Sequence, residues 1–204
     1  MPNRVDVNRR LLLLLRKSIF ANAKRLLFDS EKLFNEGSYP SAAFLAITSI
    51  EEIGKLYDVL IAYHKINENK FDAKEFYSRF RNHKMKHLSS FTKAIEPAKI
   101  SKNILHLWEI ITDDKLMTIR NNCLYEDVDV LKETISSPSS KLTRNEASYF
   151  IETAYEVLLS QIDSAFGHFW IDESQNIDRD KSEIELSMLS ARLIDFRDRK
   201  NKSD

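Results

Sequence analysis

Turn-forming residues are scarce in this chain of 204 residues, which has only three glycines and four prolines. An all-β protein needs turns at short intervals, so this scarcity argues against that fold class. Hydrophobic residues make up 43% of the chain and charged residues 30%, enough for a sizeable core beneath a well-solvated surface. We therefore predict an all-α protein, an antiparallel bundle of about five to six helices with a C-terminal helical extension.

Cysteine is almost absent as well, because Cys123 is the only one. A single cysteine excludes an internal disulfide and any zinc site built from several cysteines. It also fits a reducing compartment, and we predict a cytoplasmic protein. The three glycines are far apart, so phosphate-loop, dinucleotide and nucleophile-elbow motifs are missing, and we expect no cofactor.

The chain has neither an excess of one charge nor a long apolar run. Its 31 basic residues balance its 31 acidic ones, so there is no overall electrostatic attraction to nucleic acid or anionic membranes. The apolar run Leu11–Leu15 is far shorter than the ~20 residues that cross a bilayer, and no secretory cleavage site follows it. We expect a core-facing first helix, a soluble protein and no membrane partner.

The stretch Ser38–Tyr63 is apolar on more than one side and predicts the central, most buried helix. Its first residue is a common helix N-cap, and Pro40 is tolerated in a first turn. Three charges interrupt this stretch. Glu51 and Lys55 are spaced for an i, i+4 ion pair, whereas Glu52 lies in line with apolar residues and needs a partner from elsewhere in the chain.

Apolar periodicity and capping residues predict the remaining elements. The other predicted helices cover residues 7–35, 101–120, 143–166 and 178–204, with Ser101 as the N-cap of the second of these. A short helix is also predicted from residue 72, either separate from or continuous with a segment over residues 81–96. Thr143 and Glu146 have the spacing of a capping box, and residues 128–141 are expected to form a loop.

The C-terminal part of the chain differs in composition from the rest, since it is highly charged. We predict a bundle domain over residues 1–170 and an extension over residues 171–204, helical at first and then frayed. The extension is expected to pack on a partner or on the bundle through a thin apolar stripe. The predicted stripe consists of Ile184, Met188, Leu189 (or Ala191) and Phe196.

A first candidate site contains two histidines. His83 and His87 recur in step with neighbouring phenylalanines and are predicted to lie on an inward side, while Lys86 points elsewhere. Histidines at i, i+4 can share a metal with a carboxylate such as Glu51 or Glu52. However, the HExxH glutamate and the paired ExxH motifs of di-iron bundles are missing. We favour a structural hydrogen-bond network in which His83 or His87 pairs with Glu52, and we expect no bound metal.

A second candidate site is formed by Arg120 and Tyr125, which stand five positions apart at the end of a predicted helix. An arginine offers a fork of donors suited to a phosphate or to a developing anionic transition state. The alternative is an ordinary arginine at a helix C-terminus, where its charge is favourable to the helix dipole. Spacing alone favours that alternative.

Several motifs taken together resemble those of the AbiV family of bacterial abortive-infection proteins. The resemblance covers roughly residues 21–166, and the first twenty residues and the segment after Asp172 lie outside it. The motifs are Tyr39-Pro-Ser-Ala-Ala43, Glu51-Glu-Ile-Gly-Lys55, His83-Lys-Met-Lys-His87, Leu124-Tyr-Glu-Asp127, Ser137-Pro138 and Thr143-Arg-Asn-Glu-Ala147.

The resemblance implies defence against bacteriophage by shutting down the infected cell, through a block of translation after a phage product is sensed. The helical layout is also similar to the broader HEPN superfamily, whose members are helical bundles, often dimeric, and in many cases metal-independent ribonucleases. Their signature is an arginine, a polar residue, and a histidine four to six positions after the arginine. Arg120 and Asn121 match its start, but Tyr125 stands where the histidine is expected.

For an RNA-cleaving protein, the resemblance implies that Arg120 contacts the scissile phosphate and Asn121 orients it. Tyr125 is then a substitute acid, since an ordinary tyrosine pKa of about 10 makes a poor base at neutral pH. His83 or His87 supplies the base if its helix packs near Arg120.

The resemblance also implies the partners, which are a second copy in a homodimer, a phage-encoded activator and RNA. An acidic and basic cluster of Glu51, Glu52, Lys55 and Lys86 completes the candidate residues. The competing hypotheses are a non-catalytic helical module that captures a phage or translation component, and a metal-binding bundle.

Overall fold

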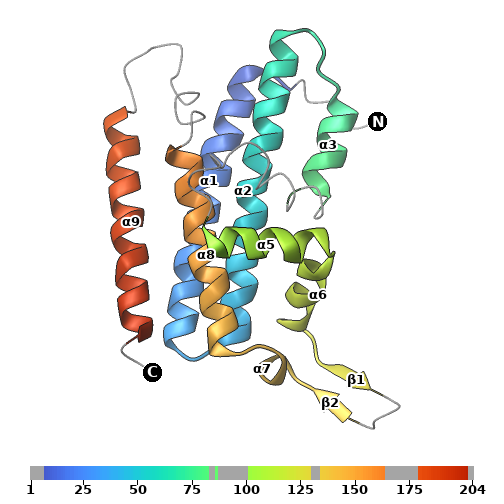
Figure 1. Ribbon diagram of the computed structural model, residues 1–204. Helices are drawn as coiled ribbons and strands as arrows, with labels where there is room; N and C mark the ends of the chain where they lie inside the picture. The colour runs from blue at the N-terminus through green and yellow to red at the C-terminus, as the bar shows by residue number, and fades with distance from the viewer. Residues whose placement is uncertain (1–6, 83–85, 87–100, 130–133, 164–178, 202–204) are drawn as a thin grey trace.

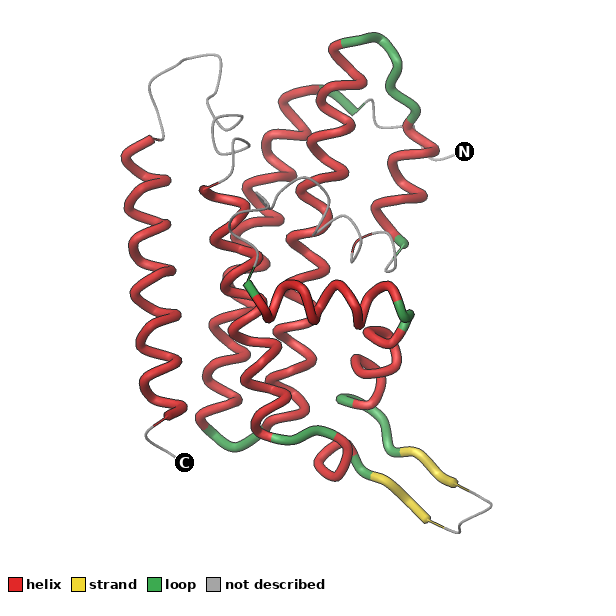
Figure 2. Tube along the Cα trace, viewed as in Figure 1, coloured by secondary structure: helices red, strands yellow, loops and turns green. Residues whose placement is uncertain are grey.

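The computed structural model describes residues 7–82, 86, 101–129, 134–163 and 179–201 (Figure 1). Long helices run side by side, with shorter helices packed against one side of them (Figures 1 and 2). The prediction of an all-α helical bundle is confirmed. Within the described residues, no helix is both long enough and apolar enough to cross a membrane.

Helices α1 (Arg9–Asn35) and α2 (Tyr39–Asn67) form an antiparallel hairpin joined by a tight turn. Gly37 adopts a left-handed φ of 80° in this turn, a conformation that glycine reaches without steric cost. Pro40 lies in the first turn of α2, as predicted, and Ser38 is the N-cap residue although its hydroxyl makes no capping hydrogen bond.

Helix α2 is the centre of the bundle, in contact with α1, α3, α6, α7 and α8. Small residues bring its first half close to α1, and buried serine hydroxyls bond across that contact. The Ser30 hydroxyl donates to the Ala42 carbonyl at 2.7 Å, and the Ser49 hydroxyl donates to the Ala23 carbonyl at 2.8 Å. These bonds satisfy polar groups that burial would otherwise leave unpaired.

The helices that pack against α2 from one side are short. Helix α3 (Ala73–Arg81) begins directly after Asp72, where a short helix was predicted to start, and α5 (Lys102–Thr112) begins after the predicted cap Ser101. The predicted helix 101–120 is broken at Asp114, whose φ of 58° is left-handed, so α6 (Lys115–Asn122) starts in a new direction (Figure 1). This turn places the end of α6 beside α2.

Residues 128–141 contain regular structure, so the prediction of a loop there was wrong. Strands β1 (Asp127–Asp129) and β2 (Thr134–Ser136) pair antiparallel, with Val128 opposite Ile135, and extend away from the helices (Figure 2). A single helical turn, α7 (Pro138–Lys141), follows. Strands of three residues are too short to show the alternation by which strands are recognised.

Helix α8 (Arg144–Asp163) starts with the predicted capping box. The Glu146 amide donates to the Thr143 hydroxyl oxygen at 3.3 Å, and the Thr143 amide donates to the Glu146 carboxylate at 2.7 Å. Its core face is mainly apolar and includes Tyr155. The buried residues of this face are Ala147, Phe150, Ile151, Ala154, Tyr155, Val157 and Leu158.

The extension forms helix α9 (Arg179–Asn201), which packs along α8 (Figure 1). Its buried apolar side chains are Leu189, Leu193 and Phe196, one helical face at steps of four and three residues. The predicted stripe was therefore partly wrong, because Ile184 and Met188 are 60% and 52% exposed. The extension does pack on the bundle, one of the two predicted alternatives.

A buried carboxylate on α1 anchors α9. Glu31 is 3% exposed, and its oxygens lie 3.0 Å from Nε of Arg192 and 3.1 Å from Nη2 of Arg199. The hydroxyl of Tyr155, on α8, donates to the same carboxylate. Helices α1, α8 and α9 therefore meet at the Glu31 carboxylate, which accepts hydrogen bonds from side chains of α8 and α9.

A second carboxylate binds the same helix from α8. Glu152 lies 3.0 Å from Nε of Arg197 and 3.0 Å from Nζ of Lys200. Burial raises the pKa of Glu152, but the hydrogen bonds and charges of Lys200 and Arg197 outweigh it and lower the pKa below its ordinary value. The attachment of α9 is therefore electrostatic as well as apolar.

We expect Glu31→Gln to lower the free energy of unfolding by about 1–3 kcal/mol, because two guanidinium groups would then face a neutral amide. Chemical unfolding monitored by circular dichroism measures this loss. Asp29→Asn is a matched control on the same helix, since Asp29 pairs only across the surface with Arg25 and Lys32 in the described structure, and should change stability by less than about 0.5 kcal/mol. Equal losses in the two variants would contradict the anchoring role of Glu31.

Candidate functional site

Five charged residues from three segments that are far apart in the sequence meet around the middle of α2. They are Glu51, Glu52 and Lys55 of α2, Lys86, and Arg120 of α6, and we call them the polar cluster. All five belong to the candidate residues predicted from the sequence. Three of them are basic and two are acidic.

Arg120 reaches α2 from the last turn of α6. Its Nε lies 3.2 Å from a carboxylate oxygen of Glu51, and the two side chains are 19% and 3% exposed. Among the described residues this Nε has no partner in hydrogen-bond geometry, so the contact with Glu51 is chiefly electrostatic. The guanidinium carbon also lies 4.9 Å from the centre of the Phe44 ring, a cation–π contact.

Glu52 forms an ion pair with Lys55, three residues further along the same helix. The ammonium of Lys55 also lies 5.3 Å from the centre of the Phe80 ring. The prediction had assigned Lys55 to Glu51 and a histidine to Glu52. It was wrong about Lys55, because the i, i+3 spacing gives Lys55 a partner on its own helix while Glu51 pairs with distant Arg120.

Lys86 is packed directly against α2 at Gly54. A Cβ atom added to Gly54 would lie 1.9 Å from the carbonyl oxygen of Lys86 and 2.7 Å from its carbonyl carbon. Only a glycine therefore permits this approach of two backbones. The prediction that Lys86 points elsewhere was wrong, since the residue is 6% exposed.

The surroundings of Lys86 disfavour the positive charge of its ammonium group. Burial lowers the pKa of its ammonium group below the ordinary value, and the positive charges of Lys55 and Arg120 act in the same direction. The carboxylates of Glu51 and Glu52 oppose this shift without cancelling it. The polar cluster is thus an electrostatically coupled group rather than a set of separate ion pairs.

The sequence profile of the AbiV family, a HEPN-type family, matches residues 11–159. The chain belongs to the AbiV family. Membership indicates a role in abortive infection, the phage-defence response in which the infected cell is shut down. A search of curated proteins and a search of solved structures gave no match. The family match runs from α1 through most of α8 and leaves α9 outside it.

The motif of this AbiV-family chain around Arg120 divides between interior and surface. Asn121 and Tyr125 are exposed, Tyr125 to 63%, whereas Arg120 is mostly buried. The backbone carbonyl of Asn121 accepts from the amides of Leu124 at 3.0 Å and Tyr125 at 3.1 Å. The peptide turn after α6 therefore presents the tyrosine to solvent.

The two predicted histidines, His83 and His87, lie outside the described residues. Their assigned roles, as partners of Glu52 or as a catalytic base, remain predictions. Within the described part of the chain, no group of three or more histidine, cysteine, aspartate or glutamate side chains is arranged to hold a metal ion.

Sequence reasoning missed three residues that shape the polar cluster. Phe44 and Phe80 provide ring faces for Arg120 and Lys55, and Gly54 admits the Lys86 backbone. Gly54 did carry a signal. A glycine inside an apolar helix costs about 1 kcal/mol relative to alanine, so its presence in the centre of α2 indicates a close approach.

The single cysteine lies beside this site but does not face solvent. Cys123 follows α6 and is buried, with its thiol donating to the Ile119 carbonyl at 3.2 Å. Burial raises the pKa of the Cys123 thiol to about 11, and the Glu146 charge acts in the same direction. A thiol with that pKa is almost wholly protonated at neutral pH, which makes it a poor nucleophile.

We expect Gly54→Ala to destabilise the protein by about 1–3 kcal/mol, although alanine ordinarily stabilises a helix. The added methyl group would collide with the Lys86 carbonyl, which is backbone and cannot rotate away. Thermal unfolding measures the loss, and an unchanged or increased melting temperature would contradict the close approach.

Proposed function

We propose that this AbiV-family chain is an abortive-infection effector that arrests the infected cell by cleaving RNA as a metal-independent HEPN-type endoribonuclease. The observation that supports this most is the convergence of the polar cluster, in which Arg120 of the HEPN motif meets charged residues of two other segments. The pKa of Lys86 is lowered in this cluster, and titratable groups with perturbed pKa values are characteristic of functional sites.

A purely structural role explains the polar cluster less well. Burial of Lys86 beside two further cations opposes folding, since its lowered pKa shows that the charged form is disfavoured there. An apolar residue at that position would stabilise the bundle more simply. Three cations against two carboxylates also leave one net positive charge, which favours binding of a phosphodiester.

The proposed reaction is attack of a ribose 2′-oxygen on the adjacent phosphorus, which breaks the bond to the 5′-oxygen. Arg120 binds the phosphate and stabilises the charge that develops on its oxygens, and Asn121 orients it. Tyr125 donates its phenolic proton to the departing 5′-oxygen. The proton of the 2′-hydroxyl passes to His83 or His87, the predicted bases outside the described residues.

A second candidate function is a non-catalytic module that captures a phage or translation component. It is favoured by the burial of Arg120 against Glu51 and Phe44 and by the tyrosine that replaces the motif histidine. The projecting hairpin of β1 and β2 is its natural contact surface, since Ile135 is 72% exposed there. Either function is compatible with a homodimer and a phage-encoded activator, which we propose as partners.

We expect Arg120→Ala to abolish growth arrest and to reduce RNA cleavage by the purified protein, in the presence of a phage lysate as activator, by at least about 10²-fold. Arg79→Ala is the matched control, because Arg79 also pairs with a buried α2 carboxylate, that of Asp58, at 3.0 Å. Arrest lost in Arg120→Ala and kept in Arg79→Ala, at similar melting temperatures, supports RNA cleavage. Arrest that persists in Arg120→Ala would overturn it.

The double variant Glu51→Gln with Arg120→Gln separates function from folding, because it removes both charges and leaves neither one unpaired. Restored stability without restored RNA cleavage supports a catalytic Arg120. Recovery of cell arrest in the double variant would assign Arg120 a structural role and favour the capture module.

Lys86→Met should abolish growth arrest while leaving the free energy of unfolding unchanged or higher. The lowered pKa of Lys86 means that, up to the ordinary value of 10.5, the unfolded chain holds this proton more firmly than the folded one. Wild-type stability should therefore gain with rising pH in the alkaline range below 10.5, relative to the Met variant. Chemical unfolding across that pH range measures the difference, and a variant less stable than wild type at neutral pH would contradict it.

A further inference from the structure

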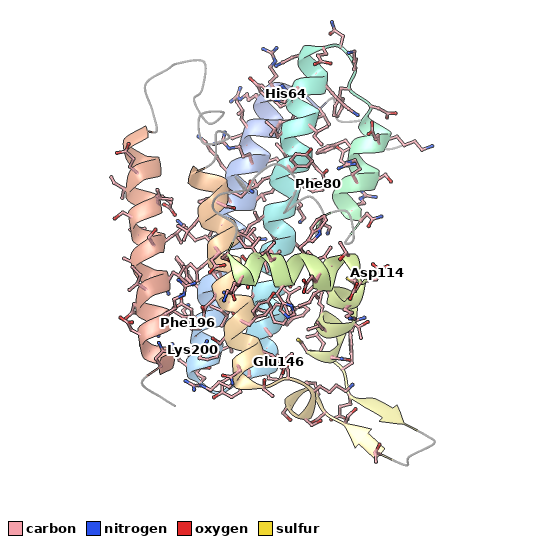
Figure 3. The ribbon with its side chains drawn as sticks, in the orientation of Figure 1. His64, Phe80, Asp114, Glu146, Phe196 and Lys200 are labelled. Carbon is pink, nitrogen blue, oxygen red and sulfur yellow. The ribbon has the colours of Figure 1, made fainter. Side chains whose placement is uncertain are left out.

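A cleft lies at one end of the bundle, away from the polar cluster. Its volume is about 440 Å³, within the range of about 300–1,000 Å³ that is typical of small-molecule sites. It is lined by residues from α1, α2, α8 and α9, near the end of α9 at which Figure 3 labels Phe196 and Lys200. No residue of the polar cluster lines it.

The charged side chains that line the cleft are all basic, namely Arg144, Arg199 and Lys200. Two helices begin there and two end there, so the helix dipoles oppose one another and the side chains decide the sign of the potential. The acidic partners of these side chains form no part of the lining: Glu31 and Glu152 are buried, and Asp195, which lies 3.0 Å from Nε of Arg199, is exposed. The cleft therefore presents positive charge to a ligand.

These basic groups are held in place before any ligand arrives. Arg144 donates from Nη2 to the Lys200 carbonyl at 3.2 Å, and the Lys200 ammonium lies 3.0 Å from the Glu152 carboxylate. Arg199 lies 3.1 Å from Glu31. Side chains that are already ordered lose little conformational entropy on binding.

Aromatic rings line the same cleft beside the cations. The Phe34 ring lies 5.3 Å from the Tyr39 ring and 5.2 Å from the Phe196 ring, and the Arg144 guanidinium lies 5.6 Å from the Phe34 ring, all measured to ring centres. Tyr39 is half-buried, so part of its ring lines the opening. Aromatic faces stack with nucleobases, and guanidinium groups bind phosphate.

We propose that this cleft binds a nucleotide, with the phosphate at the basic side chains and the base against Tyr39. The nucleotide is a free mononucleotide or the terminal nucleotide of an RNA strand. Phe196, Arg199 and Lys200 lie outside the family match, whereas Tyr39 and Arg144 lie inside it, so the cleft is formed jointly by the shared bundle and by α9. The proposal goes beyond RNA cleavage and does not depend on it.

Isothermal titration of the full chain tests this with the four ribonucleoside 5′-monophosphates, a short oligoribonucleotide bearing a 5′-phosphate, and inorganic phosphate. We expect at least one nucleotide to bind with a Kd below about 1 mM and to raise the melting temperature. Inorganic phosphate should bind at least about tenfold more weakly, because it lacks the ring. Binding of the oligonucleotide alone supports the site if Arg144→Gln weakens it and Arg120→Ala does not, and it then identifies the ligand as an RNA end.

Arg144→Gln and Tyr39→Ala should each weaken nucleotide binding by about tenfold or more. Lys24→Met is the matched control, because it breaks an ion pair between α1 and α9, that of Lys24 with Glu185, away from the cleft. Lys24→Met and Arg120→Ala should both bind the nucleotide as wild type does, so a failure of the proposed cleavage chemistry leaves this result unaffected.

Three outcomes would overturn the proposal. They are the absence of binding by every nucleotide and by the oligonucleotide, phosphate binding as tight as nucleotide binding, and nucleotide binding that persists unchanged in both cleft variants. Melting curves establish that the variants are folded, and Lys200→Met provides a further cleft variant if Tyr39→Ala does not fold.

Discussion

The burial of α2 on nearly all sides is the constraint on which the rest of this structure depends. A helix surrounded by other helices cannot leave a carboxylate in water, so each charge on it has to be neutralised by a nearby side chain. Three ion pairs do this: Glu51 pairs with Arg120 of α6, Glu52 with Lys55 of the same helix, and Asp58 with Arg79 of α3. The short helices are therefore positioned by the charges of α2 as well as by its apolar surface.

Ion pairs also hold the opposite side of the bundle, where the carboxylates again belong to core helices and the cations to the helix packed on them. There, buried carboxylates on α1 and α8 hold a highly charged C-terminal helix whose apolar face is narrow. A helix with so little apolar surface would be marginal alone, and ion pairs with Glu31 and Glu152 add to the attachment that its buried apolar side chains provide. The family match ends before α9, so these contacts join the extension to the shared bundle.

Sequence patterns predicted features that depend on neighbouring residues and failed where distant segments meet. The apolar density of α2, the Ser101 cap and the Thr143–Glu146 capping box were all predicted correctly, because each has a local physical cause. The membership of the polar cluster was largely anticipated through family motifs. The partners within it were not, since Arg120 stands far from Glu51 in the chain and Lys86 is fixed by a backbone contact with Gly54.

The hairpin and the outer face of α9 show the two other limits of sequence reasoning. Three-residue strands produce no period, and a helix with apolar residues on several sides does not reveal which side is covered. Leu193 lies on the buried face and Ile184 on the exposed one, although both are apolar β- or γ-branched residues of similar size. Which of these two side chains is buried depends on the position of α8 against α9.

The buried thiol of Cys123, close to Arg120 in the sequence, allows local opening of the protein to be detected by chemical labelling. Cys123 is the only cysteine, so every reaction with a thiol reagent comes from this one position. Because the sulfur is buried and protonated, labelling has to wait until the end of α6 separates from the bundle. The rate of labelling therefore measures how often this end of α6 opens, without any engineered probe.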